Sequence, residues 1–296
     1  MYCFVLKMHI QAIAIADPVG IGLAPLYHIS EMKKLLTIIS LSALLFTSCS
    51  KDDDNILAES EGKATVSFDA MFGSQDFALN KGFTVGSNTL TFNKLRYWVS
   101  NVVLVNSKNE EFKVPSSYYL IEETNAINLT GVNNDLSTTV YPATKREDVV
   151  LKEIPAGDYK SIRFSIGVEQ KYNDNLSLQT GELSQLNGMT NVSWMWLTSY
   201  IYTSLGGTIT NGTTSKTLKV ETGLNANYKT VTLDFPAAVR ISSTKATNIV
   251  LNADISKAID GLDVYSTNTV GGSQAAAMTT VATNYATKVF SVKSVK

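Results

Sequence analysis

Apolar and polar residues alternate along much of the chain after residue 63. In residues 64–72, Val66, Phe68 and Ala70 share one parity, and the polar residues Thr65, Ser67 and Asp69 share the other. Side chains two positions apart lie on one face of a β-strand, so this alternation predicts a strand with one buried face. Further runs rich in β-branched and aromatic residues predict strands at 89–105, 118–122, 148–152, 161–168, 193–205, 217–221, 230–235 and 248–254.

Turn-forming residues separate these runs. Pro155–Asp158 is typical of a turn before a strand, and Gly206–Gly207 is typical of a hairpin turn. Only 256–261 and 274–286 have a helical composition. The pattern predicts one all-β domain over residues 64–296, an antiparallel β-sandwich with Greek-key-like connections and minor helices.

Two of the three tryptophans lie in one short apolar segment. In a strand, Trp194, Trp196 and Tyr200 share one face, and Met195 and Leu197 lie on the other. Both faces are apolar, which favours a central strand buried on both sides, with the rings in the core. A ligand-stacking surface is the alternative that the same rings allow.

The N-terminal region has the composition of a secretory signal. A basic start at Met32–Lys34 precedes a mostly apolar run at 35–45, and Cys49 follows two small residues. The apolar run is short for a membrane span, although an uncleaved anchor is the alternative. We predict an upstream mis-start at 1–31, a lipoprotein signal peptide at 32–48, and a lipidated cysteine with an acidic linker at 49–63.

The end of this signal resembles a bacterial lipobox. The resemblance implies cleavage before Cys49, lipid on its sulfur and attachment to a membrane. Asp52–Asp54 resemble the export signal of Bacteroidetes lipoproteins, although a solvated tether also has such charges. The expected location is the outer membrane, at its periplasmic or cell-surface face.

Composition excludes several kinds of function. The net charge is −1, and no basic stripe indicates nucleic-acid binding. Cys3 and both histidines, His9 and His28, precede Cys49, so the mature chain has no histidine. This excludes Ser-His-Asp and Cys-His nucleophile systems and removes the commonest zinc and copper ligands. We expect a protein that is not an enzyme.

The order of five motifs resembles the MbnP-like domain family, named for a periplasmic copper-binding protein of methanobactin systems. One motif, Lys94–Asn101, has the spacing K-L-x-Y-x-x-S-N. The other stretches are 68–80, 154–168, 179–200 and 284–290. The resemblance implies a secreted β-rich protein that binds copper through ligands including histidines. It also implies a tryptophan, here Trp194 or Trp196, that a di-haem partner of the cytochrome c peroxidase type oxidises to kynurenine.

The sequence departs from this family where the metal ligands are expected. Ala70, Glu221 and Ala276–Met278 stand where the family often has histidine. Copper binding is therefore expected to be altered or lost, with Met71, Glu221 and Met278 as the remaining candidate ligands. Thioether sulfur suits Cu(I), but methionine is also a common core residue.

Two oxygen-rich stretches, Asn133–Asp135 and Asn173–Asn175, are candidate calcium loops. Neither has the spacing of a dedicated calcium loop, and such clusters also form ordinary turns. Calcium is therefore a second candidate metal.

Two functions remain open. The first is a lipid-anchored, non-enzymatic MbnP-like binding protein with altered or lost copper binding. The second is a surface lipoprotein that binds carbohydrate or another macromolecule through exposed rings, with Trp98, Trp194 and Trp196 as the candidates.

Overall fold

The computed structural model describes residues 61–129, 140–178, 181–191 and 199–296. All of them belong to one compact unit, Leu57–Lys296. Cys49, Trp194 and Trp196 lie outside the described residues.

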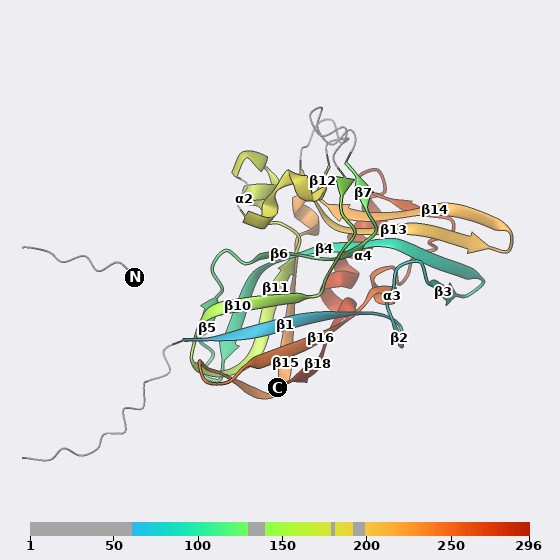
Figure 1. The fold of residues 1–296 in the computed structure, drawn as a ribbon. Coiled ribbons are helices and arrows are strands. Elements are labelled where there is room, and N and C mark those ends of the chain that lie inside the picture. The colour runs from blue at the N-terminus through green and yellow to red at the C-terminus, as the bar shows by residue number, and fades with distance from the viewer. Residues whose placement is uncertain (1–60, 130–139, 179–180, 192–198) are drawn as a thin grey trace, which may run out of the picture. The chain divides into compact units, whose positions relative to one another are not determined.

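The strands of this unit form two sheets and a small two-stranded ribbon (Figure 1). The small sheet has the order β10-β1-β16-β18, with β2 paired to β1. Its strands are β1 (Glu61–Phe72), β2 (Gln75–Asp76), β10 (Asp148–Pro155), β16 (Thr247–Asp254) and β18 (Phe290–Val295).

The large sheet has the order β15-β11-β4-β13-β14-β17, and shorter strands pair along β4, β6 and β13. Its main strands are β4 (Asn88–Asn106), β11 (Gly157–Ile166), β13 (Ser199–Asn211), β14 (Thr214–Gly223), β15 (Lys229–Ile241) and β17 (Thr269–Val270). Its shorter strands are β3 (Gly82–Val85), β5 (Glu111–Lys113), β6 (Tyr118–Thr124), β9 (Thr144–Arg146) and β12 (Thr190–Asn191). The ribbon pairs β7 (Ile127–Asn128) with β8 (Val140–Tyr141).

Most strand pairs are antiparallel, which confirms the predicted all-β sandwich. Two pairs, β1 with β16 and β14 with β17, are parallel. The alternation that predicted β1 is confirmed, because Val66, Phe68 and Ala70 are buried and face the core.

Aromatic rings join the two sheets across the core. Phe68 of the small sheet lies 5.5 Å from Phe164 and 6.3 Å from Tyr97, between ring centroids, and both of these belong to the large sheet. Both contacts are edge-to-face, an arrangement that aromatic quadrupoles favour. The face of the large sheet that packs here is called the inner face, and the opposite face is called the outer face.

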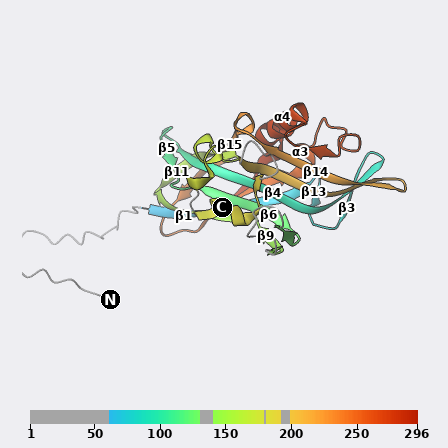
Figure 2. The same ribbon diagram turned by 90° about the horizontal axis from the view of Figure 1, so that it is seen from above.

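Helices are minor, as the sequence predicted. Near the C-terminus, α4 (Ala275–Asn284) continues into a π-helical turn at Tyr285–Val289, and α3 (Ile255–Ala258) is short. Seen from above, α4 lies beside β14 (Figure 2). Another short helix, α2 (Gln170–Asn173), precedes 3-10 turns at Leu176–Leu178, Gly181–Leu183 and Gln185–Asn187, and a further one lies at Asn225–Asn227. Within the described ranges, no helix has the length and apolar character needed to cross a membrane.

The strand predicted at 193–205 is described only from Ser199 onward, and it extends further than predicted, to Asn211. The described strand β13 begins at Ser199, and β12 pairs with its first residues. Gly206–Gly207 lie within β13, so the predicted hairpin turn is wrong at this place. The turn lies at Gly212 instead, where φ is +57°. The paired glycines permit a close approach of β4, which a turn prediction from composition does not consider.

Candidate functional site

Five polar residues form a transverse row on the outer face of the large sheet. Strand register places Glu221 opposite Ser204, Ser204 opposite Arg96, Arg96 opposite Glu122, and Glu122 opposite Arg146. Directly opposed residues of neighbouring strands point to the same face. This polar row therefore crosses β14, β13, β4, β6 and β9 without a gap.

The centre of the polar row is a buried ion pair. Arg96 Nε donates to Glu122 Oε2 at 2.7 Å, and Tyr141 OH donates to Glu122 Oε1 at 2.5 Å. The Arg96 guanidinium carbon also lies 4.5 Å from the centroid of the Tyr141 ring, within cation–π range. Burial and the bond to Glu122 raise the pKa of the Tyr141 hydroxyl, which therefore acts as a donor at neutral pH.

The terminal nitrogens of Arg96 are not satisfied. The Arg96 side chain is fully buried, and neither Nη1 nor Nη2 has a hydrogen-bond partner in the described part of the chain. Buried guanidinium N–H groups usually find acceptors, because leaving one unpaired costs about 1–3 kcal/mol or more. Among the described residues, the Trp98 indole N–H is another buried donor without a partner.

Ion pairs hold both ends of the polar row. Arg146 donates from Nη1 and Nη2 to Glu182 at 2.6 and 2.9 Å, and this hydrogen bonding raises the pKa of its guanidinium. At the other end, Glu221 accepts from Ser204 at 3.2 Å and lies 3.1 Å from the Lys219 ammonium. Lys94 Nζ lies 3.7 Å from Glu221, and burial lowers the pKa of Lys94.

A second small core covers the outer face beside the polar row. Trp98 is fully buried there and meets Tyr200 edge-on, with ring centroids 6.1 Å apart. The residues buried with them are Leu120, Val168, Leu183, Met189, Ile201 and Tyr202. Because α2 and the turns after it supply part of this cover, the outer face is not a bare solvated surface.

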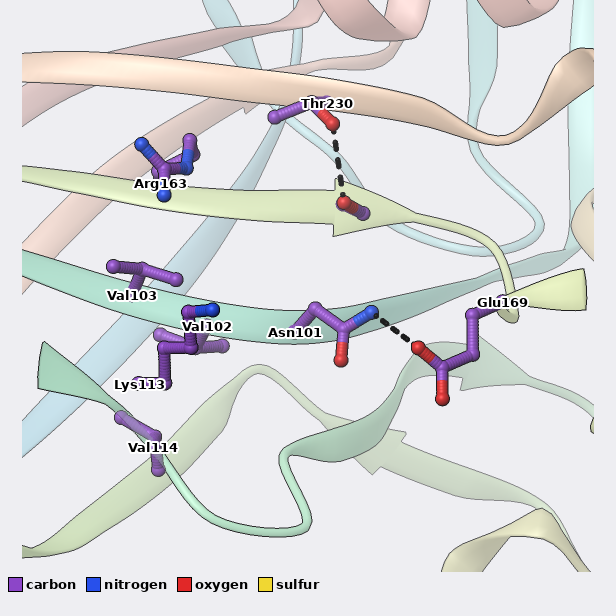
Figure 3. Close-up of a pocket in the computed structure, with 9 residues that line it drawn as sticks. Asn101, Val102, Val103, Lys113, Val114, Arg163, Glu169 and Thr230 are labelled. Carbon is purple, nitrogen blue, oxygen red and sulfur yellow. Dashed lines mark hydrogen bonds between the residues drawn. The ribbon is translucent and has the colours of Figure 1, made fainter. Parts of the chain in front are cut away.

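A polar pocket of about 330 Å³ lies beyond this second core, at a bulge in β4 (Figure 3). Register shifts between β4 and β11 at this point, and Asn101 adopts a left-handed φ of +50°. Valine side chains and polar groups line the pocket together: Asn101, Val102, Val103, Lys113, Val114, Arg163, Ser165, Glu169 and Thr230.

Hydrogen bonds fix one wall of this pocket. Asn101 Nδ2 donates to Glu169 Oε2 at 3.0 Å and to Tyr228 OH at 2.6 Å. Tyr118 OH donates to Glu169 Oε1 at 2.8 Å, and burial together with this bond raises the pKa of Tyr118. On the opposite wall, Arg163 holds Glu111 with two hydrogen bonds of 2.9 and 2.7 Å.

The three residues predicted as metal ligands are not brought together. Met278 is buried in the main core, where its sulfur accepts a hydrogen bond from Asn227 at 3.0 Å. Met71 lies on β1 between two residues that face this core, so its own side chain points away from it. Glu221 points to the outer face, as part of the polar row. Among the described residues, no three acidic, histidine or cysteine side chains gather closely enough to hold a metal.

The other predicted site residues have different outcomes. Trp194, Trp196 and the lipidation site Cys49 lie outside the described residues, so their roles stay predictions. Trp98 was a candidate for an exposed stacking ring, and this is wrong, because its side chain is fully buried. Its place in an apolar strand with neighbours on both sides explains the burial.

One candidate calcium loop is described. Asn173 accepts from the Tyr200 amide at 2.9 Å and donates to Asn225 at 2.8 Å, and Asp174 accepts from Asn225 at 2.7 Å. These side chains therefore tie α2 to β13 and to the turn before β15. The second loop, 133–135, lies outside the described residues, and calcium binding stays a prediction.

Sequence reasoning missed the polar row and the pocket. One signal was available, because Arg96 is a single strong charge within the apolar run Leu95–Leu104. A charge in a buried strand needs a partner and marks a site worth attention. The identity of that partner, Glu122, depends on strand pairing, which composition does not give.

Comparison with known proteins identifies the family of the chain. No curated protein matches the chain. Among solved structures, the chain is similar to MbnP from Methylosinus trichosporium at 15% sequence identity, with a TM-score of 0.41, and the match covers 65% of this chain and 76% of that one. The MbnP family model matches residues 61–279. This match spans most of the chain and confirms the resemblance of its motifs, and the protein belongs to the MbnP family.

Proposed function

We propose that the protein is a non-enzymatic binding protein, and that the pocket beside Asn101 holds its ligand. The observation that carries this proposal is the convergence of polar groups from separate elements on one cavity of about 330 Å³. This volume lies in the range of small-molecule sites, about 300–1,000 Å³. Asn101 belongs to the Lys94–Asn101 motif, which resembles a motif of the MbnP-like family, and this supports a role for the pocket in binding.

The charges of the pocket favour a neutral ligand. Glu169 lines it together with Lys113 and Arg163, and Glu111 pairs with Arg163. The two cations and two anions balance. The remaining polar groups are an amide and two hydroxyls, from Asn101, Ser165 and Thr230, which donate and accept hydrogen bonds. A small hydroxyl-rich molecule such as a sugar unit fits this chemistry. The sugar would be recognised by hydrogen bonding rather than by Trp98.

Substituting Asn101 with glycine tests this proposal. Glycine adopts the φ of +50° freely, so Asn101→Gly removes the amide while the bulge is kept. We expect titration calorimetry with neutral mono- and oligosaccharides to show binding that falls about tenfold in this variant, the effect of one or two lost hydrogen bonds.

The matched control is Asn80→Gly, at an exposed turn residue with a φ of +60°. This variant should bind as the natural protein does. If no saccharide binds the natural protein, or if both variants bind equally, the pocket is not the ligand site.

Copper binding is proposed to be lost at the three candidate residues. The mature chain has no histidine, the Met278 sulfur faces Asn227 in the core, and the Glu221 carboxylate is engaged by Lys219 and Ser204. We expect the protein to take up no Cu(I) from a chromogenic chelator under anaerobic conditions, and Met278→Leu to behave identically. Stoichiometric uptake that Met278→Leu abolishes would contradict this.

We also propose that lipid on Cys49 attaches the protein to a membrane, and that this membrane is the outer membrane. A di-haem partner that oxidises Trp194 or Trp196 is a further part of the proposal. The support is the lipobox-like sequence and membership of the MbnP family. An intact-mass measurement on protein from its own host tests the lipid anchor and the oxidation of tryptophan, and fractionation of that host's membranes tests the outer-membrane placement. A mass without acyl chains argues against the anchor, and an unmodified tryptophan mass argues against the oxidising partner.

A further inference from the structure

The amide of Asn101 offers one free acceptor to the pocket that it lines. Both N–H groups of its Nδ2 are used, in bonds to Glu169 Oε2 at 3.0 Å and to Tyr228 OH at 2.6 Å. The Glu169 carboxylate fixes this orientation, because an amide oxygen turned toward it would place two acceptors together. Oδ1 therefore points away from Glu169 (Figure 3), and no described residue donates to it. This oxygen is free to accept an N–H or O–H group of a ligand.

A small apolar patch lies two residues further along β4. Val102 belongs to the main core, so its neighbour Val103 points to the outer face. Strand register places Val103 opposite Arg163 on one side and opposite Lys113 on the other, so these three side chains share that face. The aliphatic stems of arginine and lysine add apolar surface beside the valine. The pocket therefore offers a site for one apolar group next to the Asn101 amide.

Lys113 supplies a donor beside this patch. Its side chain is exposed and forms no ion pair with another described residue, whereas Arg163 is held by Glu111 through two hydrogen bonds. An ammonium group donates up to three hydrogen bonds and accepts none. The pocket thus combines an acceptor at Asn101 with a donor at Lys113, and Val103 lies beside both.

An acetamido group matches these three features of the pocket. Its N–H donates, its carbonyl oxygen accepts and its methyl group is apolar. Residues two apart on a strand lie about 7 Å apart along it. A secondary amide with one hydrogen bond on each side spans about 8 Å, which is close to this separation. The N–H can therefore donate to Asn101 Oδ1 while the carbonyl oxygen accepts from Lys113 and the methyl group packs on Val103.

The remaining polar groups of the pocket fit the hydroxyls of a sugar ring. Ser165 Oγ and Thr230 Oγ1 lie 3.3 Å apart, and each hydroxyl can donate and accept. Glu169 accepts one bond at each oxygen, from Asn101 and from Tyr118, and a carboxylate has room for further donors. The cavity of about 330 Å³ is near the lower end of the range of small-molecule sites, about 300–1,000 Å³, which suits a single ring.

We propose that the Asn101 pocket selects an N-acetylated amino sugar, with its acetamido group held between Asn101 Oδ1 and the Lys113 ammonium. This inference rests on the proposed function and deepens it, because it names the class of sugar. Acetylation removes the positive charge of the amino group, in agreement with the balanced charges of the pocket. A free amino sugar adds a cation beside Arg163 and Lys113 and binds more weakly for that reason.

Lys113→Met connects the selectivity to the acetamido contact. Methionine keeps an apolar stem beside Val103 and removes the ammonium. We expect the methyl glycoside of N-acetylglucosamine to bind about tenfold more weakly to this variant, with little change for that of glucose. Lys152→Met is the matched control, at an exposed lysine of the small sheet, and it should bind both glycosides as the natural protein does. Equal losses for the two glycosides in Lys113→Met, or no loss for either, would overturn the contact.

Calorimetric titration of the natural protein tests the class of ligand with four probes. The methyl glycosides of N-acetylglucosamine, glucose and glucosamine differ only at C2, and N-acetylalanine methylamide carries an acetamido group without a sugar. We expect the N-acetylglucosamine glycoside to bind about tenfold more tightly than the glucose glycoside, the effect of one or two added hydrogen bonds. Equal affinities for these two would overturn the selection of the acetamido group and leave the proposed sugar pocket standing. Binding of no sugar would overturn both, and tightest binding of the glucosamine glycoside or of the peptide-like amide would overturn the assignment to an N-acetylated sugar.

Discussion

Replacing Glu122 with alanine is expected to lower the free energy of unfolding by about 3–5 kcal/mol. The substitution leaves the Arg96 guanidinium fully buried without Glu122, its carboxylate partner among the described residues, and it removes the acceptor of the Tyr141 hydroxyl. An isolated buried charge is far more costly than the absence of a buried ion pair. Denaturant unfolding followed by tryptophan fluorescence measures the change.

A surface pair provides the control for Glu122. Glu111 also holds an arginine, Arg163, through two hydrogen bonds, but its side chain is exposed. Because solvent screens exposed pairs, Glu111→Ala should cost much less than Glu122→Ala. The double variant Arg96→Met, Glu122→Leu should recover a large part of the loss, because it removes both buried charges together. Equal losses from Glu111→Ala and Glu122→Ala would show that the polar row is not electrostatically isolated from water.

Local periodicity was enough to predict the strands of the sandwich. Val66, Phe68 and Ala70 alternate with polar residues, and they occupy the buried face of β1 as this pattern requires. The same alternation explains why Met71 does not lie near the other candidate ligand in the core. Since Ala70 and Phe72 face the core, the side chain between them cannot share a site with a core residue such as Met278.

The polar row could not be predicted in the same way. Its members lie on five different strands and are spread along the sequence between Arg96 and Glu221. Only the pairing registers place them opposite one another. A shift of one residue in any strand would turn its member to the other face. The unusual position of Arg96 in an apolar strand was visible in the sequence, but its ion-pair partner and its unpaired nitrogens were not.

The pocket depends on an irregularity that composition does not show. Asn101 takes a positive φ where β4 bulges against β11, and this turns its amide toward Glu169. Asparagine tolerates that conformation better than most residues, yet asparagine is common in loops as well. The motif that ends at Asn101 thus drew attention to this position in the sequence. The chemistry of the pocket became clear only from the hydrogen-bond partners of Asn101 in the structure.

Replacing Gly207 with alanine is expected to lower the free energy of unfolding by more than about 3 kcal/mol, a loss typical of an unavoidable backbone clash. A Cβ at this position would lie 2.1 Å from the Thr91 carbonyl oxygen and 2.8 Å from the Phe92 Cα. Both atoms belong to the backbone of β4, in the middle of the large sheet, so no side-chain rotation relieves the contact. The strands must separate or change register.

Alanine substitutions at two other glycines distinguish the clash at Gly207 from general effects of replacing glycine with alanine. Gly271 has nothing within 4 Å of an added Cβ, and Gly271→Ala should change the free energy of unfolding by less than about 0.5 kcal/mol. Gly212 is also open but has a φ of +57°, so Gly212→Ala should cost about 1–2 kcal/mol from backbone strain alone. Denaturant unfolding ranks the three variants, and similar losses for Gly207→Ala and Gly212→Ala would show that β4 and β13 can move apart at little cost.

The effect of Gly207→Ala should extend to the outer face. The register between β13 and β4 shifts between Gly206 and Gly207, directly before the rungs that pair Lys94 with Gly206 and Arg96 with Ser204. If the bulge relaxes by one residue, Ser204 turns to the inner face and Arg96 loses its neighbour in the row. This loss of register adds to the clash, so Gly207→Ala should unfold at a lower denaturant concentration than Gly212→Ala as well as Gly271→Ala.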